Sequence, residues 1–184
     1  THFDKVFNEL SGKTWGIAGL GSIGRRVADV AKAFGCRVVY FSASGHTYDT
    51  EFKRVSFDEL LENSDIISIH APLNDKTNNL FDDAAFAKMK KNAVLLNLGR
   101  GPIVNNAALT KALKENIIAG AGLDVIDKEP IAADNPLLEI QDSSKLIITP
   151  HIAWATYEAR VRLMDEVYEN IKAFEAGESR NAVV

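Results

Sequence analysis

Two polar side chains with complementary chemistry follow apolar runs in the second half of the sequence. Arg100 lies just past the run 93–97, and its planar guanidinium can hold a carboxylate through two parallel hydrogen bonds. The glycines on either side should leave this guanidinium uncrowded. His151 follows Pro150 and the run 145–149, and an imidazole, which titrates at about pH 6.5, can donate a proton near neutral pH. Taken alone, either residue is more often an ordinary surface or structural one.

Two carboxylates, Asp124 and Glu129, lie at and beyond the end of a third apolar run, residues 118–125. A carboxylate against one imidazole nitrogen fixes the tautomer and favours the protonated ring, so Glu129 is a candidate partner for His151. The alternative is an ordinary polar loop that holds both acids. Sequence spacing alone does not show that Glu129 and His151 touch.

The motif GLGSIG, residues 19–24, is the first candidate binding site along the chain. Gly19 and Gly21 allow a tight turn and the close approach of a pyrophosphate, and Gly24 lets the next helix pack on a sheet. The apolar run before the motif and the helical pattern after it favour a dinucleotide-binding loop over a turn that needs glycines for geometry alone. Methyltransferases that bind S-adenosylmethionine use similar loops, but the later motifs do not suit them.

The residue that should contact the adenosine ribose departs from the usual pattern. An acidic residue is expected about 20 positions after the motif, whereas Ser42 stands 18 residues after Gly24. A neutral side chain removes the carboxylate that would repel the 2′-phosphate of NADP. The segment SASGHTYDT contains no Arg or Lys, and His46 is its one possible cation. The sequence therefore favours NAD and leaves NADP open.

These candidate residues follow apolar runs that alternate with amphipathic stretches. The first helical stretch carries Ile23, Val27, Val30, Ala31 and Phe34 at helical spacing. Continuous apolar strands that alternate with helices predict an α/β fold, a doubly wound parallel sheet of the Rossmann type with three α/β/α layers, in which ligands bind at the carboxyl ends of the strands. We expect residues 1–184 to form one dinucleotide-binding domain. The expected strands are 14–20, 37–41, 65–70, 93–97, 118–125 and 145–149, and the expected helices are 22–34, 56–64, 82–90, 106–116 and 156–174.

Composition excludes several other classes of protein. The 184 residues are 46% hydrophobic and 25% charged with a net charge of −4, which suits a globular domain and not a nucleic-acid-binding surface. No apolar run reaches the roughly 20 residues that span a bilayer. The single cysteine, Cys36, should be buried; it cannot form an internal disulfide or a Cys-rich zinc site, and it suits a reducing, cytoplasmic location. We expect no metal, nucleic acid or membrane as a partner.

Five motifs occur in an order that resembles one known family. GLGSIG, HAPLNDKTNNL, NLGRGPIVNNAAL, AGLDVIDKEP and TPHIAWAT are similar to the motifs of the D-isomer-specific 2-hydroxyacid dehydrogenases, from about residue 11 to the end. The segment HIAWATYEARVRL, with Trp154, most resembles the glycerate dehydrogenase (hydroxypyruvate reductase) branch. Two positions depart from the family pattern. Ser42 replaces the common Asp, and Asn105-Asn106 replaces an acidic helix start, where Asn should still cap the helix well.

The resemblance implies a role for each candidate residue. Arg100 would bind the substrate carboxylate and polarise the keto group, His151 would be the acid/base, and Glu129 would be the partner of His151. Asp124 would lie near the nicotinamide carboxamide. The cofactor would also contact Gly19, Gly21, Ser22, Ile23, Gly24, Ser42, Ala71, Pro72, Leu98 and Gly99.

The implied reaction is hydride transfer between NAD or NADP and a small D-2-hydroxy acid or 2-oxo acid. Family members are longer, carry a substrate domain built largely from residues before the cofactor domain, and are commonly homodimers. Only about a dozen residues precede GKTWGIAGLG here, so we expect an excised cofactor domain that binds dinucleotide but turns over little alone. A dinucleotide-sensing regulatory module on the same fold is the alternative. It would need none of Arg100, Glu129 and His151. A plain structural α/β module is a weaker alternative.

Overall fold

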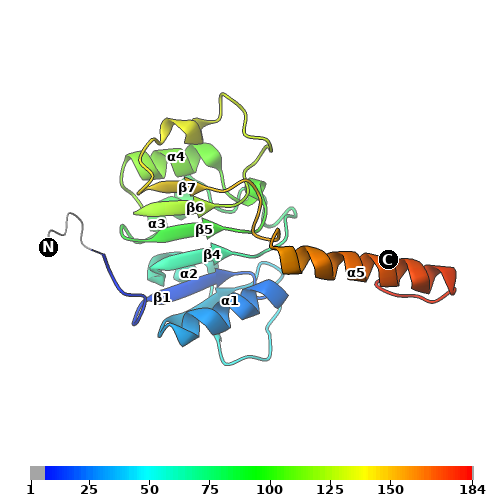
Figure 1. The fold of residues 1–184 in the computed structure, drawn as a ribbon. Coiled ribbons are helices and arrows are strands. Elements are labelled where there is room, and N and C mark those ends of the chain that lie inside the picture. Colours follow the sequence, from blue (N-terminus) through cyan, green and yellow to red (C-terminus); the bar gives the residue numbers. More distant parts are fainter. Residues whose placement is uncertain (1–6, 184) are drawn as a thin grey trace, which may run out of the picture. The chain divides into compact units, whose positions relative to one another are not determined.

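A computed structural model describes residues 7–183 of the chain. The chain divides into two compact units, Thr1–Pro150 and His151–Val184, and each is described by itself. The first unit holds a sheet with helices on its faces, and the second holds one long helix (Figure 1). Within residues 7–183, no helix is both long and apolar enough to cross a membrane.

Seven parallel strands form one sheet in the order β3-β2-β1-β4-β5-β6-β7. Six of them lie within the predicted apolar runs, which confirms the doubly wound parallel sheet. The prediction lacks β3 because its two residues are charged and exposed. The strands are β1 (Thr14–Ala18), β2 (Arg37–Phe41), β3 (Lys53–Arg54), β4 (Ile66–Ile69), β5 (Val94–Asn97), β6 (Gly120–Leu123) and β7 (Leu146–Ile148).

The strand order reverses direction beside β1, which pairs with β2 on one side and with β4 on the other. At such a switch point the crossovers on the two sides diverge and leave a crevice at the carboxyl ends of the strands. The ends of β1 and β4, on the right-hand edge of the sheet in Figure 1, are therefore the place where a ligand is expected.

Helices cover both faces of the sheet, which confirms the three layers. Ile17 and Ala18 are neighbours in β1 but belong to different apolar clusters, because successive strand side chains point to opposite faces. The cluster around Ala18 includes Leu60, Phe86 and Leu109 of three helices, whereas the cluster around Ile17 packs against one helix. The helices of the first face are α2 (Phe57–Asn63), α3 (Asp83–Lys88) and α4 (Asn106–Lys114), and α1 (Ser22–Ala33) covers the second face. The short 3₁₀ helices η1 (Gly101–Ile103) and η2 (Pro136–Glu139) add Ile103 and Leu137 to the cluster of the first face.

Side chains cap the starts of all three helices on the first face. Ser56 and Glu59 form a complete capping box at the start of α2. Asp82 caps α3, and Asn105 caps α4 by accepting a 2.9 Å hydrogen bond from the backbone N–H of Ala108. Asn at this position therefore serves as a cap, as expected from the departure at Asn105-Asn106.

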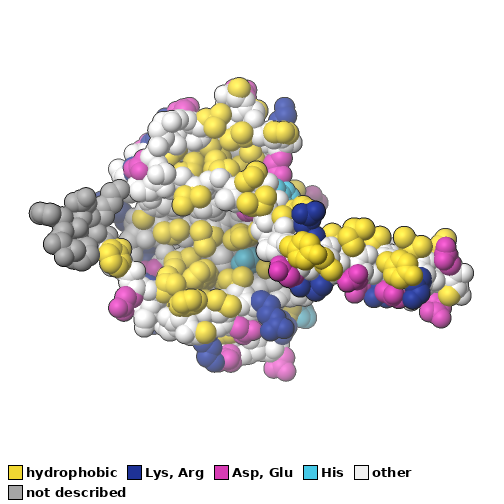
Figure 2. Space-filling view, viewed as in Figure 1, with side chains coloured by type: hydrophobic (Ala, Val, Ile, Leu, Met, Phe, Trp, Pro, Cys, Tyr) yellow, Lys and Arg dark blue, Asp and Glu magenta, His cyan; other side chains and the backbone are white. Residues whose placement is uncertain are grey.

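Only part of the predicted apolar stripe of α1 faces the sheet: Ala31 is buried and Val27 packs against the core, but the other members are exposed. The buried residues of α1 are Gly24, Ala28 and Ala31, whereas Val30 is 56% exposed and Phe34 is 60% exposed. Small side chains let the helix lie close to the strands, and the large ones remain on its outer side. In the second unit, α5 (Tyr157–Glu175) begins at the Thr156 cap and has exposed apolar side chains along its length (Figure 2).

Candidate functional site

The turn between β1 and α1 requires glycine at two of the three motif positions. Gly19 has a φ of +100°, and a Cβ on this residue would lie 2.6 Å from the backbone nitrogen of Ala71, just after β4. A Cβ on Gly24 would lie 2.1 Å from the carbonyl oxygen of Gly19. The backbone of the protein itself blocks a side chain at both positions. These two glycines are needed whether or not the loop binds a ligand.

Gly21 has no such structural requirement. Its φ of −75° suits any residue, and a Cβ built there meets no atom within 4 Å. As the N-cap of α1 it supplies no side-chain hydrogen bond, and the first turn holds no acidic residue. The N–H groups at the start of α1 are thus left for an acceptor from outside the helix. A pyrophosphate that approaches the backbone closely fits this open cradle and explains the glycine.

A pocket of about 470 Å³ lies beside this loop and brings together three strand ends that are distant in sequence. One wall comes from the start of α1, one from the segment after β4, and one from the segment after β5. Six residues predicted to belong to the site lie here, together with two that were not predicted, His70 and Leu73. The six are Ile23, Ala71, Pro72, Leu98, Gly99 and Arg100.

Asn97 holds the turn that presents Arg100. Its side chain is fully buried at the end of β5, donates a 3.1 Å hydrogen bond to the carbonyl of Arg100, and accepts one of 3.1 Å from the N–H of Gly99. The exposed Arg100 side chain donates from Nη1 to the Gly99 carbonyl at 2.8 Å. A guanidinium has five N–H donors, so this bond leaves donors for an anionic ligand. Sequence reasoning missed Asn97, although a polar amide that ends a buried strand was a usable signal.

The glycine after Arg100 also has a structural role that the sequence did not indicate. A Cβ on Gly101 would lie 1.8 Å from the carbonyl oxygen of Ile126. Gly101 therefore allows two backbone segments to touch. Because Glu129 accepts a 3.2 Å hydrogen bond from the N–H of Ile126, this contact brings the turn of Arg100 against the loop of Glu129.

Asp124 is buried at the end of β6, and the Thr149 hydroxyl donates a 2.6 Å hydrogen bond to its Oδ1. Its backbone N–H donates to the Asn97 carbonyl at 3.0 Å. Asp124 and Asn97 thus end neighbouring strands, and the carboxylate lies at the same sheet edge as the Arg100 turn. A buried carboxylate held in this way can accept a hydrogen bond from an amide group of a ligand.

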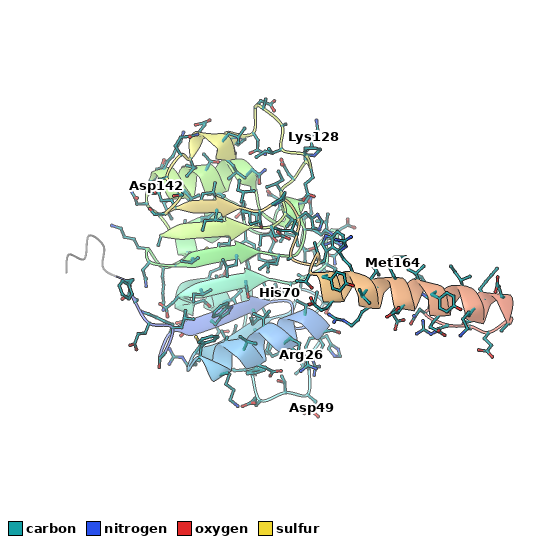
Figure 3. The ribbon with its side chains drawn as sticks, in the orientation of Figure 1. Arg26, Asp49, His70, Lys128, Asp142 and Met164 are labelled. Atoms are coloured by element: carbon teal, nitrogen blue, oxygen red, sulfur yellow. The ribbon has the colours of Figure 1, made fainter. Side chains whose placement is uncertain are left out.

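His70 is a half-buried imidazole that sequence reasoning did not select (Figure 3). Trp15 Nε1 can only donate, and it donates to Ser68 Oγ at 2.9 Å. The Ser68 hydroxyl lies 3.1 Å from His70 Nε2, and it can donate to this nitrogen, which would place the ring proton on Nδ1. Burial lowers the pKa of His70 to about 4. His70 is therefore neutral near pH 7 and does not suit the role of proton donor.

His151 opens the second unit with an unusual backbone. Its φ of +54° lies in the left-handed region, which few residues other than glycine adopt. Such conformations often occur at functional sites, where the surrounding structure holds them. Glu129 and His151 belong to different units, and their pairing stays a prediction.

The chain was compared with known protein families, curated proteins and solved structures. Residues 2–153 match the model of the D-isomer specific 2-hydroxyacid dehydrogenase, NAD binding domain. The chain belongs to the D-isomer-specific 2-hydroxyacid dehydrogenase family. It is 42% identical to a glyoxylate reductase of Korarchaeum cryptofilum over 92% of this chain and 51% of that protein. It is also 42% identical to a hydroxypyruvate reductase of Blautia hydrogenotrophica over 98% of this chain and 56% of that protein.

A solved structure of similar shape is an acyclic imino acid reductase in complex with NADPH and D-Arg. It has a TM-score of 0.89 and 35% identity, and the match covers all of this chain and 58% of that one. The chain thus spans about half the length of the curated relatives it matches. The resemblance to the dehydrogenase family and the Rossmann-type fold are both confirmed, and the chain carries the NAD-binding domain of this family.

The loop after β2 is contacted by a basic residue that the sequence reasoning missed. Ser42 is buried after β2, with its hydroxyl 3.1 Å from that of Ser44. Arg54, from the unpredicted strand β3, reaches this loop and donates from Nη1 to the Thr47 hydroxyl at 3.1 Å. Arg54 lies 12 residues beyond Ser42, outside the segment searched for cations. Only the pairing of β3 with β2 brings it here.

Proposed function

We propose that this chain is the cofactor half of a reductase that transfers hydride between NAD(P)H and a small 2-oxo acid of the glyoxylate or hydroxypyruvate class. The observation that carries this proposal is Gly21, a glycine that the fold does not require, beside a pocket that holds Arg100. The similarity to a glyoxylate reductase and a hydroxypyruvate reductase supports the substrate class. The bound nicotinamide would supply or accept the hydride.

The side chains of this chain would then divide the remaining work. Arg100 would pair with the substrate carboxylate and stabilise the negative charge that develops on the keto oxygen. His151 would give that oxygen a proton, and Glu129 would orient the imidazole and stabilise its protonated form. Asp124 would accept a hydrogen bond from the carboxamide. The remaining contacts to the dinucleotide would come from Gly19, Gly21, Ser22, Ile23, Gly24, Ser42, Ala71, Pro72, Leu98 and Gly99.

The proposal assigns substrate selection to a second domain that faces this one. Two observations support it: the relatives are about twice as long as the match, and α5 exposes large apolar side chains. Tyr157 is 77% exposed, Met164 is 64% exposed and Tyr168 is 61% exposed. Residues 1–184 would thus act as one dinucleotide-binding domain with little turnover alone. We place the protein in the cytoplasm because its single cysteine, Cys36, is buried and cannot form an internal disulfide.

The proposal also includes a homodimer that buries the outer side of α1. An apolar pocket of about 530 Å³ lies on this side, between α1 and the segment before β1, and Figure 2 shows apolar side chains gathered there. Leu10, Val30 and Phe34 contribute exposed apolar surface. Apolar patches of this kind are typical of protein interfaces. Light scattering on the chain and on Val30→Glu tests the point; a wild-type monomer would contradict it.

The decisive experiment measures cofactor binding and turnover separately. NADH and NADPH are titrated into the 184-residue chain by calorimetry, and a panel of 2-oxo acids is tested with both cofactors on a full-length parent enzyme. We expect dinucleotide binding by the chain alone, and turnover of glyoxylate or hydroxypyruvate only in the full-length protein. Turnover by the chain alone would contradict the need for a second domain. Binding without turnover in the full-length protein would instead favour a dinucleotide sensor.

A further inference from the structure

The loop between β2 and β3 brings together basic side chains from β3, from α1 and from the loop itself. Arg54 Nη1 donates to Thr47, and its Nη2 lies 3.8 Å from the position of a Cβ on Gly45. The guanidinium of Arg54 therefore lies over the part of the loop that follows Ser42 and Ser44. These serines present two hydroxyl groups, 3.1 Å apart, directly after β2.

Aromatic contacts add two further basic groups to this loop. The guanidinium of Arg25, in the first turns of α1, lies 4.9 Å from the centre of the Tyr48 ring. The imidazole of His46 meets the same ring edge-on, with the ring centres 4.4 Å apart. The backbone N–H of Tyr48 donates to the hydroxyl oxygen of the buried Tyr40 at 3.1 Å, which holds the ring in place. The loop thus has a fixed aromatic centre with basic groups around it.

One of the two acidic side chains in the same loop is already paired. Glu51 forms an ion pair with Lys32 of α1 at 2.5 Å. Asp49 lies at the outer end of the loop in Figure 3. The carboxylate that usually follows β2 is replaced by Ser42, so the position that would repel a phosphate is neutral. The charge balance close to Ser42 is therefore positive.

The location fits one part of a dinucleotide. In this fold the carboxyl end of the second strand contacts the adenosine ribose, and an Arg nearby accommodates the 2′-phosphate of NADP. A guanidinium matches the geometry of a phosphate and can bind it through two parallel hydrogen bonds. We propose that Arg54, together with Ser42 and Ser44, forms a 2′-phosphate subsite, so that this domain binds NADP(H) more tightly than NAD(H). This inference rests on the proposed dinucleotide site, whose specificity it defines.

The domain should still bind NAD(H). Ser42 and Ser44 can exchange hydrogen bonds with the ribose hydroxyls of either cofactor, and the open start of α1 takes the pyrophosphate in both cases. Arg54 distinguishes the two cofactors because only NADP(H) carries the additional phosphate. Its contribution should therefore be seen in the NADPH affinity and not in the NADH affinity.

The test compares two neighbouring cations on β3. NADPH and NADH are titrated by calorimetry into the wild-type chain, Arg54→Gln and Lys53→Gln. Both variants remove one positive charge from the same strand, but successive strand residues point to opposite sides. Lys53 acts on Glu59 of α2, whose pKa is lowered by hydrogen bonds from Ser56 and, to a smaller extent, by Lys53. Lys53→Gln is thus a control for the general loss of charge.

We expect wild type to bind NADPH more tightly than NADH, and Arg54→Gln to weaken NADPH binding by about tenfold or more, as loss of a charge-assisted pair predicts. NADH affinity should change less than about twofold, and Lys53→Gln should change both affinities equally little. Equal affinity of wild type for both cofactors, or an equal loss of both in Arg54→Gln, would overturn the subsite. Absence of NADH and NADPH binding in wild type would instead overturn the proposed function itself.

A fragment separates the phosphate from the rest of the cofactor. Adenosine 2′,5′-diphosphate and adenosine 5′-diphosphate are compared as competitors against NADH. The 2′,5′ compound should compete at least about tenfold better with wild type, and this advantage should fall in Arg54→Gln and with rising salt, because exposed charges are screened. Equal competition by the two fragments would contradict the assignment.

Discussion

The helices α1 and α4 both begin after a parallel strand at the same edge of the sheet, but they begin in opposite ways. α4 starts at Asn105, whose side chain satisfies the N–H of Ala108. α1 starts at Gly21, which supplies no side-chain hydrogen bond. Near β1 the backbone is left open for an anion, whereas near β5 the helix is closed and a side chain, Arg100, is presented instead. In the function proposed above, the backbone at the start of α1 binds the cofactor pyrophosphate, and the Arg100 side chain binds the substrate carboxylate at the same sheet edge.

The largest expected effect is the loss of activity when Arg100 is replaced, with cofactor binding unchanged. In the complete enzyme, Arg100→Ala should lower kcat/KM by at least about 100-fold, because it removes the pairing of the carboxylate and the stabilisation of developing charge. NADH affinity of the chain should change less than about twofold. Arg100→Lys keeps the charge but loses the planar fork, and should recover only part of the activity. Near-normal turnover in Arg100→Ala would remove the substrate role from the β5 end.

The next effect concerns the open helix start. Gly21→Ala should weaken dinucleotide binding by at least about tenfold, or about 1.4 kcal/mol, because the added methyl occupies the space of the pyrophosphate. The melting temperature should not fall, since a Cβ at Gly21 meets no atom within 4 Å. Gly24→Ala is the matched control: its Cβ would meet the Gly19 carbonyl at 2.1 Å, so this variant should unfold at a lower temperature. Unchanged affinity in a folded Gly21→Ala chain would contradict the phosphate cradle.

The region around β3 shows what the sequence can and cannot predict. Periodicity places six strands and their helices, because buried strands and amphipathic helices leave clear patterns. It fails at β3, whose exposed Lys53 and Arg54 carry no apolar signal. That failure matters, since β3 brings Arg54 to the loop after β2. The residues that directly follow Ser42 in the sequence contain no Arg or Lys. The basic neighbour, Arg54, comes from the pairing of β3 with β2.

The same limit applies to the residues that support the site. Glycine motifs locate the loop, but only coordinates separate Gly21, which the fold does not require, from Gly19 and Gly24, which it does. Asn97 and His70 act through hydrogen bonds to neighbours that a sequence does not reveal. The pattern therefore identifies the residues that could meet a ligand more readily than those that hold them in place.

His70 directly follows β4 and lines the same pocket as Ile23 and Arg100. Its imidazole makes the stability of the folded chain depend on pH. Because burial lowers its pKa to about 4, the unfolded chain binds a proton more readily than the folded one below about pH 6.5. This contribution to stability is present above pH 6.5 and is lost as the pH falls toward 4. After allowance for solvent screening, wild type should lose about 1–2 kcal/mol that His70→Gln does not lose. Urea unfolding at several pH values measures the difference.

The exposed His46 supplies the control for this measurement. His46→Gln should follow the wild-type dependence of unfolding free energy on pH between 4 and 6.5. If His70→Gln also shows the wild-type pH dependence of unfolding free energy, the fold does not hold the imidazole neutral. His70 would then be a candidate proton donor beside Arg100.

The smallest effect tests the closed helix start. Asn105→Ala should lower the free energy of unfolding by about 1 kcal/mol, because the N–H of Ala108 loses its acceptor. Dinucleotide affinity should stay within about twofold of wild type, since the assigned pyrophosphate cradle is at α1. Asn105→Asp keeps an acceptor and should keep the stability, which separates loss of the cap from a general disturbance. A fall in NADH affinity in a folded Asn105→Ala chain would mean that the two helix starts act on the same ligand, and the division of this sheet edge into a backbone site and a side-chain site would then be wrong.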